Sequence, residues 1–121
     1  MAGKTAVLPV EEDMLVLRVE VGGREVDVHF FEPGACPDSW KLAEQYKKRK
    51  LQPANLYLFE AVNKQFPDFH PYYATQWMDE EEEWWYAASY LVNGERVKSV
   101  YRYARGWPDG YMFAGVPLSA L

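Results

Sequence analysis

A chain of 121 residues that is 49% hydrophobic and 26% charged has the composition of one globular domain. Its net charge of −5 argues against a general nucleic-acid binder, whose affinity comes mainly from neutralising phosphates. The single cysteine, Cys36, excludes an intramolecular disulfide and is typical of a reducing compartment. No stretch approaches the roughly 18 apolar residues of a membrane span, and the first residues contain no signal-type apolar run. We therefore expect a cytoplasmic protein with no membrane contact.

The first part of the chain predicts a loose arm over residues 1–12, followed by a β-hairpin over residues 14–31. Two runs rich in Val flank Gly22-Gly23, and such a pair of runs is a strong signal for a two-residue turn. The turn would place Arg18 opposite Asp27, which is an attractive cross-strand pair. The face expected in the core consists of Leu15, Leu17, Val19, Val21, Val26, Val28 and Phe30.

Two helices are expected next, over residues 39–50 and 53–66. The first follows the helix-start residue Asp38 and ends in four basic residues, which suit the negative end of the helix dipole. The second begins at Pro53, whose fixed φ suits a first helical turn, and Pro67 ends it. Their apolar stripes are expected to contain Leu42, Ala43, Tyr46, Leu56, Phe59, Val62 and Phe66.

Residues 72–78 are compatible with two structures. They could pair back against residues 84–92 as a strand or form a short helix, because periodicity cannot separate the two over so few residues. The five acidic residues that follow could attract a basic partner or hold a hard cation weakly, but their spacing matches no calcium-binding loop. A solvated turn is therefore favoured for this run. It consists of Asp79, Glu80, Glu81, Glu82 and Glu83.

The strongest local signal is Asn93-Gly94 between two runs of β-branched and aromatic residues, 84–92 and 95–105. Both positions of a two-residue hairpin turn need a positive φ, which Asn and Gly tolerate best. The resulting register places Tyr86 opposite Tyr101. One face of this hairpin is then aromatic and the other is small, polar and basic, which is the pattern of a half-buried antiparallel sheet.

A basic stripe, Arg96, Lys98 and Arg102, lies on the small polar face of this hairpin. It could bind an anion or an acidic surface, although Lys and Arg on an exposed strand also deter edge-to-edge aggregation. In an acidic chain, the second interpretation is favoured. Trp85 lies opposite Arg102 in the same register, where a cation–π contact or a contact with a partner is expected.

The remaining residues predict a turn over 106–110 and a last strand over 111–116. The expected fold class is therefore α+β, with one domain built on a twisted antiparallel sheet of five or six strands. The elements would follow in the order ββ, αα and then three or four strands. Both helices are expected to pack on one face of the sheet.

The sequence contains no motif for catalysis, a cofactor or a metal. His29, His70 and Cys36 lack the spacing of metal ligands, and a nucleophile and base formed by Cys36 and His29 would lack an orienting group. No Gly-rich phosphate loop or nucleophile elbow occurs. We therefore expect no catalytic residue, no cofactor and no bound metal.

Aromatic residues make up 17% of the chain, and protein interfaces are enriched in Tyr and Trp. Our leading hypothesis is a non-enzymatic protein of the inhibitor, immunity or adaptor type that binds another protein. The acidic run of residues 79–83 would form a second patch in that interface. The expected contact residues are Trp85, Arg96, Lys98, Arg102 and Trp107.

Two other functions fit the same sequence. One is a small-ligand pocket, with or without catalysis, between the helices and a curved sheet. It would be lined by Tyr86, Tyr101 and Tyr103. The other is a structural subunit that assembles with itself through an exposed edge strand.

Overall fold

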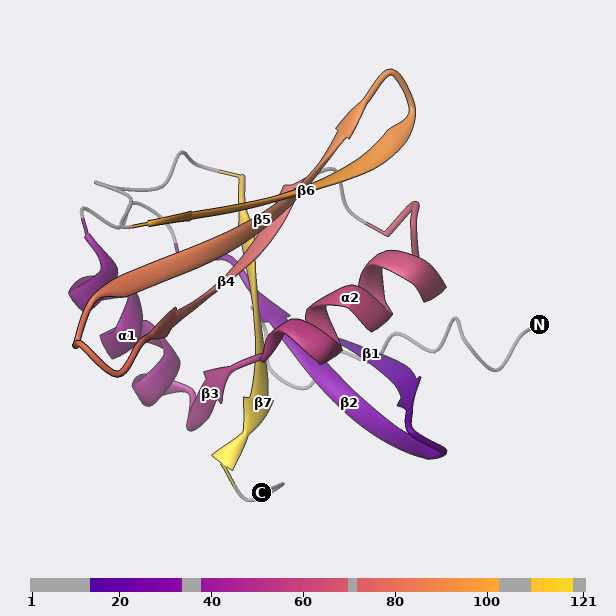
Figure 1. Cartoon of the computed structure of the whole chain (residues 1–121). Helices are drawn as coiled ribbons and strands as arrows, with labels where there is room; N and C mark the ends of the chain where they lie inside the picture. Colours follow the sequence, from indigo (N-terminus) through magenta and orange to yellow (C-terminus); the bar gives the residue numbers. More distant parts are fainter. Residues whose placement is uncertain (1–13, 34–37, 70–71, 103–109, 119–121) are drawn as a thin grey trace.

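The computed structural model describes residues 14–33, 38–69, 72–102 and 110–118. The elements are β1 (Met14–Val21), β2 (Arg24–Phe31), α1 (Ser39–Lys48), β3 (Leu51–Pro53), α2 (Leu56–Gln65), β4 (Tyr72–Met78), β5 (Trp84–Val92), β6 (Glu95–Arg102) and β7 (Met112–Pro117) (Figure 1). The predicted α+β class is confirmed. Several predicted features lie outside the described ranges, namely the arm at 1–12, Cys36, His70, Tyr103 and Trp107.

The strands form one sheet in the order β1-β2-β7-β4-β5-β6, and β3 also pairs with β7. All pairings are antiparallel except the one between β7 and β4. The described residues form seven strands rather than five or six, because β3 forms where the sequence predicted only a break between two helices. The last strand, β7, lies between β2 and β4 and so joins the two hairpins into one sheet (Figure 1).

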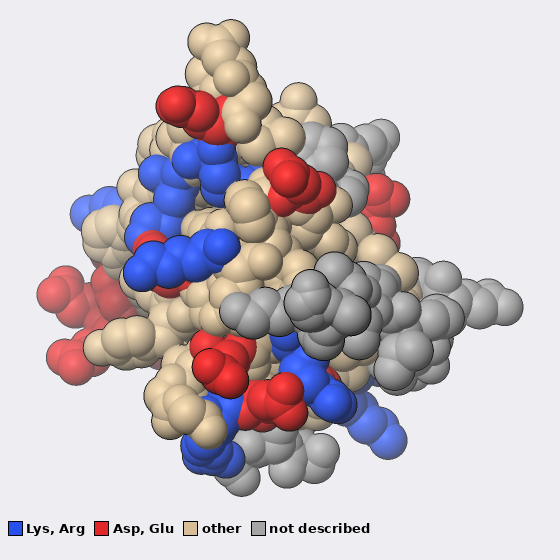
Figure 2. Space-filling model, turned by 90° about the vertical axis from the view of Figure 1, so that its right-hand side faces the viewer, with Lys and Arg blue, Asp and Glu red and all other residues tan. Residues whose placement is uncertain are grey.

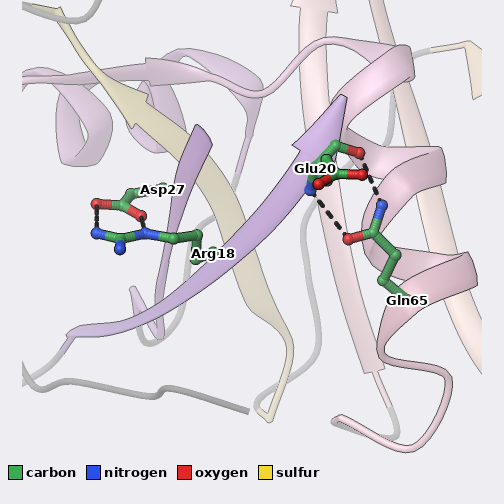
Figure 3. Close-up of polar contacts among 4 residues, drawn as sticks. All are labelled: Arg18, Glu20, Asp27 and Gln65. Atoms are coloured by element: carbon green, nitrogen blue, oxygen red, sulfur yellow. Dashed lines mark hydrogen bonds and ion pairs between the residues drawn. The ribbon is translucent and has the colours of Figure 1, made fainter. Parts of the chain in front are cut away.

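The first predicted hairpin has the expected register. Gly22 and Gly23 have φ angles of 58° and 78°, the left-handed backbone that a two-residue turn needs at both positions. Arg18 lies opposite Asp27, and its Nε donates to Asp27 Oδ1 at 2.8 Å (Figure 3). This hydrogen bond from the guanidinium holds the pKa of the Asp27 carboxyl below its usual value.

The outer edge of β1 is covered in part by a side chain instead of a strand. Gln65, the last residue of α2, accepts a hydrogen bond from the Glu20 N–H at 3.0 Å and donates one to the Glu20 carbonyl at 2.8 Å (Figure 3). The amide therefore takes the place of a neighbouring strand, and it satisfies backbone groups that otherwise invite strand pairing. These bonds also show that the Glu20 backbone groups point away from β2.

The second predicted hairpin is also confirmed. Asn93 and Gly94 have φ angles of 52° and 82°, and the predicted register continues without interruption from the turn to Arg102. Residues 72–78, which allowed a strand or a helix, form β4 and pair with β5 along their whole length. The two tight turns therefore set the register between β1 and β2 and between β5 and β6.

The two helices begin at capping side chains. The Asp38 carboxylate accepts a hydrogen bond from the Lys41 N–H at 2.8 Å, as the predicted start of α1 requires. α2 begins later than predicted, because Asn55 provides the cap by accepting from the Leu58 N–H at 2.9 Å. Pro53 instead ends β3, a short strand where a missing N–H is tolerated.

The helices pack on opposite faces of the sheet, so the prediction that they share one face is wrong. One core cluster joins α2 to Phe30 and Tyr73, whereas the other joins α1 to their chain neighbours Phe31 and Ala74. Consecutive residues of a strand point to opposite faces, so the two clusters lie on different sides, which we call the α2 face and the α1 face. In Figure 1 the two helices lie on either side of β7. The adjacent apolar pair Phe30-Phe31 is the sequence signal of a strand buried on both faces.

At Gly115, β7 passes close to α1. Tyr46 of α1 is buried, and its hydroxyl donates to the Ala114 carbonyl at 2.7 Å. A Cβ atom on residue 115 would lie 2.9 Å from Cε1 of the Tyr46 ring and 2.9 Å from the Gln52 carbonyl oxygen. Glycine is therefore required here because another side chain and a backbone carbonyl approach so closely.

We predict that Gly115→Ala destabilises the fold by about 1–3 kcal/mol, because an added methyl group in a packed core forces its neighbours to move. The shift of the denaturation midpoint at constant slope measures this loss. In a Tyr46→Ala background the same methyl group should cost less, since one of its close contacts is gone. A Gly115→Ala protein as stable as its parent would contradict this explanation.

Candidate functional site

The predicted basic stripe of β6 lies on the α2 face, where its cations contact groups of the same chain. Lys98 forms an ion pair with Glu60 of α2. Arg96 donates to the Pro67 carbonyl through Nε at 3.1 Å and Nη2 at 2.7 Å, and its guanidinium lies 5.1 Å from the Tyr73 ring centroid. These contacts fasten β6 to α2 and to the segment that follows α2.

Arg102 completes the stripe and contacts Trp85, as the register predicts. Its guanidinium lies 5.4 Å from the ring centroid and also forms an ion pair with Glu83. On the side of the molecule drawn in Figure 2, Lys and Arg side chains similarly lie beside Asp and Glu side chains. The stripe thus has an intramolecular role, and its use by a partner stays a prediction.

The acidic run between β4 and β5 forms an ordered turn around Asp79. Its Oδ1 accepts hydrogen bonds from the N–H groups of Glu81 at 2.9 Å and Glu83 at 3.0 Å, and its Oδ2 accepts one from Trp85 Nε1 at 2.7 Å. The three glutamates between Asp79 and Glu83 are exposed. Within the described ranges, no group of three or more His, Cys, Asp or Glu side chains could hold a metal ion. The arrangement is that of a solvated turn.

A set of tyrosines gathers on the α1 face around β4, β5 and β6. Pairing places Tyr72 opposite Tyr90 and Tyr86 opposite Tyr101, and Tyr111 precedes β7. Tyr86, Tyr90 and Tyr111 pack against the core cluster that includes α1. We call these five residues the tyrosine face.

Four of the five rings of the tyrosine face form two pairs. Tyr86 and Tyr101 stack with centroids 5.1 Å apart and an interplanar angle of 28°, and Tyr72 and Tyr111 lie 5.5 Å apart at 36°. Tyr72 and Tyr101 are 46% and 45% exposed. The face therefore presents large aromatic surfaces to solvent in positions that the sheet already fixes.

Two tryptophans extend this aromatic surface. Trp84 lies on the same face two residues before Tyr86, and its ring meets that of Trp40 edge-to-face with centroids 5.3 Å apart. Trp40, from the first turn of α1, is 61% exposed. Trp40 therefore lies at the surface and contacts the sheet through Trp84.

The hydroxyl groups of the tyrosine face influence one another. Burial raises the pKa of Tyr86, and the neighbouring Tyr101 raises it further because two phenolate charges would repel. Burial is also the main cause that raises the pKa of Tyr111, followed by the hydroxyls of Tyr72, Tyr90, Tyr86 and Tyr101. The phenols of Tyr86 and Tyr111 are therefore neutral at physiological pH and can both donate and accept hydrogen bonds.

Two surface hollows lie around the β1–β2 hairpin, at the other end of the sheet from β5 and β6. One, of about 490 Å³, is lined by residues that include the Arg18–Asp27 pair and His29, and the other, of about 360 Å³, is lined by Tyr57 and Val26 among others. Burial lowers the pKa of His29. Neither hollow is the pocket predicted from the sequence, whose described members, Tyr86 and Tyr101, belong to the tyrosine face.

Sequence reasoning found part of the tyrosine face. It named Tyr86 and Tyr101 for a pocket but did not place Tyr72 or Tyr111 beside them. The strand interpretation of residues 72–78 carried the signal for Tyr72, since it pairs that segment with β5. Tyr111 joins the face because β7 pairs in parallel with β4, and no local pattern indicates that pairing.

No protein-family model matches this chain, and no similar protein was found among curated proteins or solved structures. In the part of the chain that the structure describes, no helix has the length and apolar character needed to cross a membrane.

We predict that Tyr86 and Tyr111 titrate above the ordinary tyrosine pKa of about 10. Because their pKa values are higher in the folded than in the unfolded state, the unfolded chain loses these protons first, and stability falls as the pH rises above about 10. Absorbance at the phenolate band follows the titration, and denaturation at several pH values follows the stability. Tyr101→Phe should lower the pKa of Tyr86 by removing a repelling charge. An unchanged titration in that variant would disprove the coupling.

Proposed function

We propose that this chain is a non-enzymatic binding protein of the inhibitor, immunity or adaptor type, which docks another protein on the tyrosine face. The observation that carries the proposal is the pairing of partly exposed tyrosine rings on a sheet. Tyrosine and tryptophan are enriched among the residues that contribute most to protein–protein affinity. Because strand pairing already orders these rings, binding would cost little side-chain entropy.

The charge of the chain and the chemistry of the rings favour a partner that presents Lys or Arg. A net charge of −5 steers cationic surfaces toward the protein, and aromatic faces attract guanidinium and ammonium groups. The same contact occurs within the chain, where the guanidinium of Arg49 lies 4.4 Å from the ring centroid of Phe31. Cytoplasmic residence stays a prediction in this proposal.

The basic stripe is a weaker candidate for the main contact. Lys98 and Arg102 would have to leave their carboxylate partners, Glu60 and Glu83, or share them with the incoming protein. Tyr72 and Tyr101, by contrast, already present 46% and 45% of their surface to solvent. For this reason we assign the stripe a supporting role.

The decisive variant is Tyr72→Ala combined with Tyr101→Ala. Once affinity capture from the native host has identified the partner, we expect this variant to bind it at least tenfold more weakly, because truncation of interface tyrosines commonly costs more than about 1.4 kcal/mol. Titration calorimetry measures the affinity, and circular dichroism confirms that the variant is folded.

The matched control is Tyr57→Ala, because Tyr57 is 81% exposed on α2 and lies outside the tyrosine face. It should bind within about twofold of the parent. A Trp85→Ala, Arg102→Ala variant tests the basic stripe in the same assay. Loss of binding only in this last variant, with full binding by the tyrosine variant, would refute docking on the tyrosine face.

A further inference from the structure

β6 forms one outer edge of the sheet, and in the described part of the chain it pairs only with β5. In a two-residue hairpin the residues that flank the turn form a hydrogen-bonded pair, and the direction of the backbone groups alternates from there. Alternate residues of β6, among them Lys98, Val100 and Arg102, therefore direct N–H and C=O groups outward. No described backbone group bonds to these three residues from outside the β5–β6 pair.

The opposite edge of the sheet supports this assignment of direction. The same rule applied to the Gly22-Gly23 turn directs the backbone groups of Glu20 outward from β1, and the two hydrogen bonds to Gln65 confirm it (Figure 3). The chain thus supplies a side-chain amide that covers part of one edge. Within the described residues, β6 has no equivalent cover.

Two of the three cations that would normally protect this edge strand form ion pairs within the chain. Lys and Arg on an edge discourage pairing because their charges stay in solvent. Here Lys98 is paired with Glu60 and Arg102 with Glu83. Both carboxylates belong to the same chain, so the charges of Lys98 and Arg102 are compensated within it, while Arg96 donates to the Pro67 carbonyl.

From this edge we propose a self-association site: β6 pairs antiparallel with β6 of a second copy of the chain, about a two-fold axis at Ser99. In this register Lys98 and Val100 exchange backbone hydrogen bonds with Val100 and Lys98 of the second copy. Ser99 faces Ser99 of that copy as a non-hydrogen-bonded pair. The result is one sheet that continues through two molecules, and the interface includes Tyr101 at the border of the tyrosine face.

In this register the side chains of β6 are complementary to those of β6 in the second copy. Val97 faces Tyr101 of the second copy on the α1 face, and aromatic rings opposite β-branched residues stabilise antiparallel pairs. Val100 and Tyr101, which are 43% and 45% exposed, would both be covered in part. The one like-charge pair is Arg96 opposite Arg102, and each of these guanidinium groups already contacts an acceptor in its own chain.

Pairing through a single short strand buries less surface than a standard interface, so we expect dissociation constants in the micromolar range. Light scattering and sedimentation from about 1 to 500 µM should therefore show the mass rising from 14.1 kDa toward twice that value. Val100→Pro removes one outward N–H group at a position where an edge strand tolerates proline, and it should weaken dimerisation at least tenfold. A parent protein that stays monomeric over this range would overturn the proposal.

Cysteine cross-linking tests the position of the axis. In a Cys36→Ser background, Ser99→Cys should form a disulfide-linked dimer on mild oxidation, because Cα atoms of a facing non-hydrogen-bonded pair lie about 4.5 Å apart. Val97→Cys is the matched control. It lies on the same face but faces residue 101, so it should not link to itself, whereas a mixture of Val97→Cys and Tyr101→Cys proteins should cross-link.

The outcomes separate this proposal from its alternatives. A dimer that forms without a Ser99→Cys cross-link and is unaffected by Val100→Pro would place the contact elsewhere and overturn the proposal. A parent that is monomeric when pure, but whose β6 edge is protected from hydrogen exchange only in the presence of another protein, would assign the edge to that protein and also overturn it. Tyr72 lies in β4 and outside this interface, so binding by a Tyr72→Ala single variant tests the tyrosine face separately from the dimer.

Discussion

Side-chain alternation along the strands, fixed by two tight turns, determines where the candidate residues of this protein lie. Gly22-Gly23 and Asn93-Gly94 hold the left-handed backbone that sets the register of each hairpin. A slip of one residue in the register would exchange the two faces of a strand. It would move Trp85 to the α1 face and Tyr86 to the α2 face. β7 carries the alternation from one hairpin to the other, since Phe113 belongs to the α1 cluster and Ala114 to the α2 cluster.

The sequence is informative where structure is local. Both turns, both hairpin registers and the start of α1 at Asp38 follow from residue types within a few positions, and all are confirmed. The placement of β7 and the division of the helices between two faces are set by contacts between distant residues. Residue propensities alone therefore do not predict the placement of β7 or the face on which each helix packs. The Phe30-Phe31 pair is a signal of burial on both faces that the prediction of one covered face did not use, and it does not say which helix covers which face.

In the candidate site, too, the sequence predicts what depends on nearby residues and misses what depends on distant contacts. The excess of aromatic residues is visible in the sequence, and the turn at Asn93-Gly94 correctly pairs Tyr86 with Tyr101. The role of the cations was not visible, because Lys98 meets Glu60 only after α2 has packed on its face. Charges that look available along a strand can therefore be used within the fold, whereas rings that look like core can remain at the surface.

The position of β7 in the chain has a consequence for how the molecule assembles. Each hairpin closes over a short loop, whereas the pairing of Phe30 with Ala114 joins residues that lie far apart in the sequence. Closing so large a loop is slow. Until β7 has paired, the edges of β2 and β4 that it covers stay open. During that interval the terminal strand of one polypeptide could insert into another, so concentrated refolding should favour domain-swapped species.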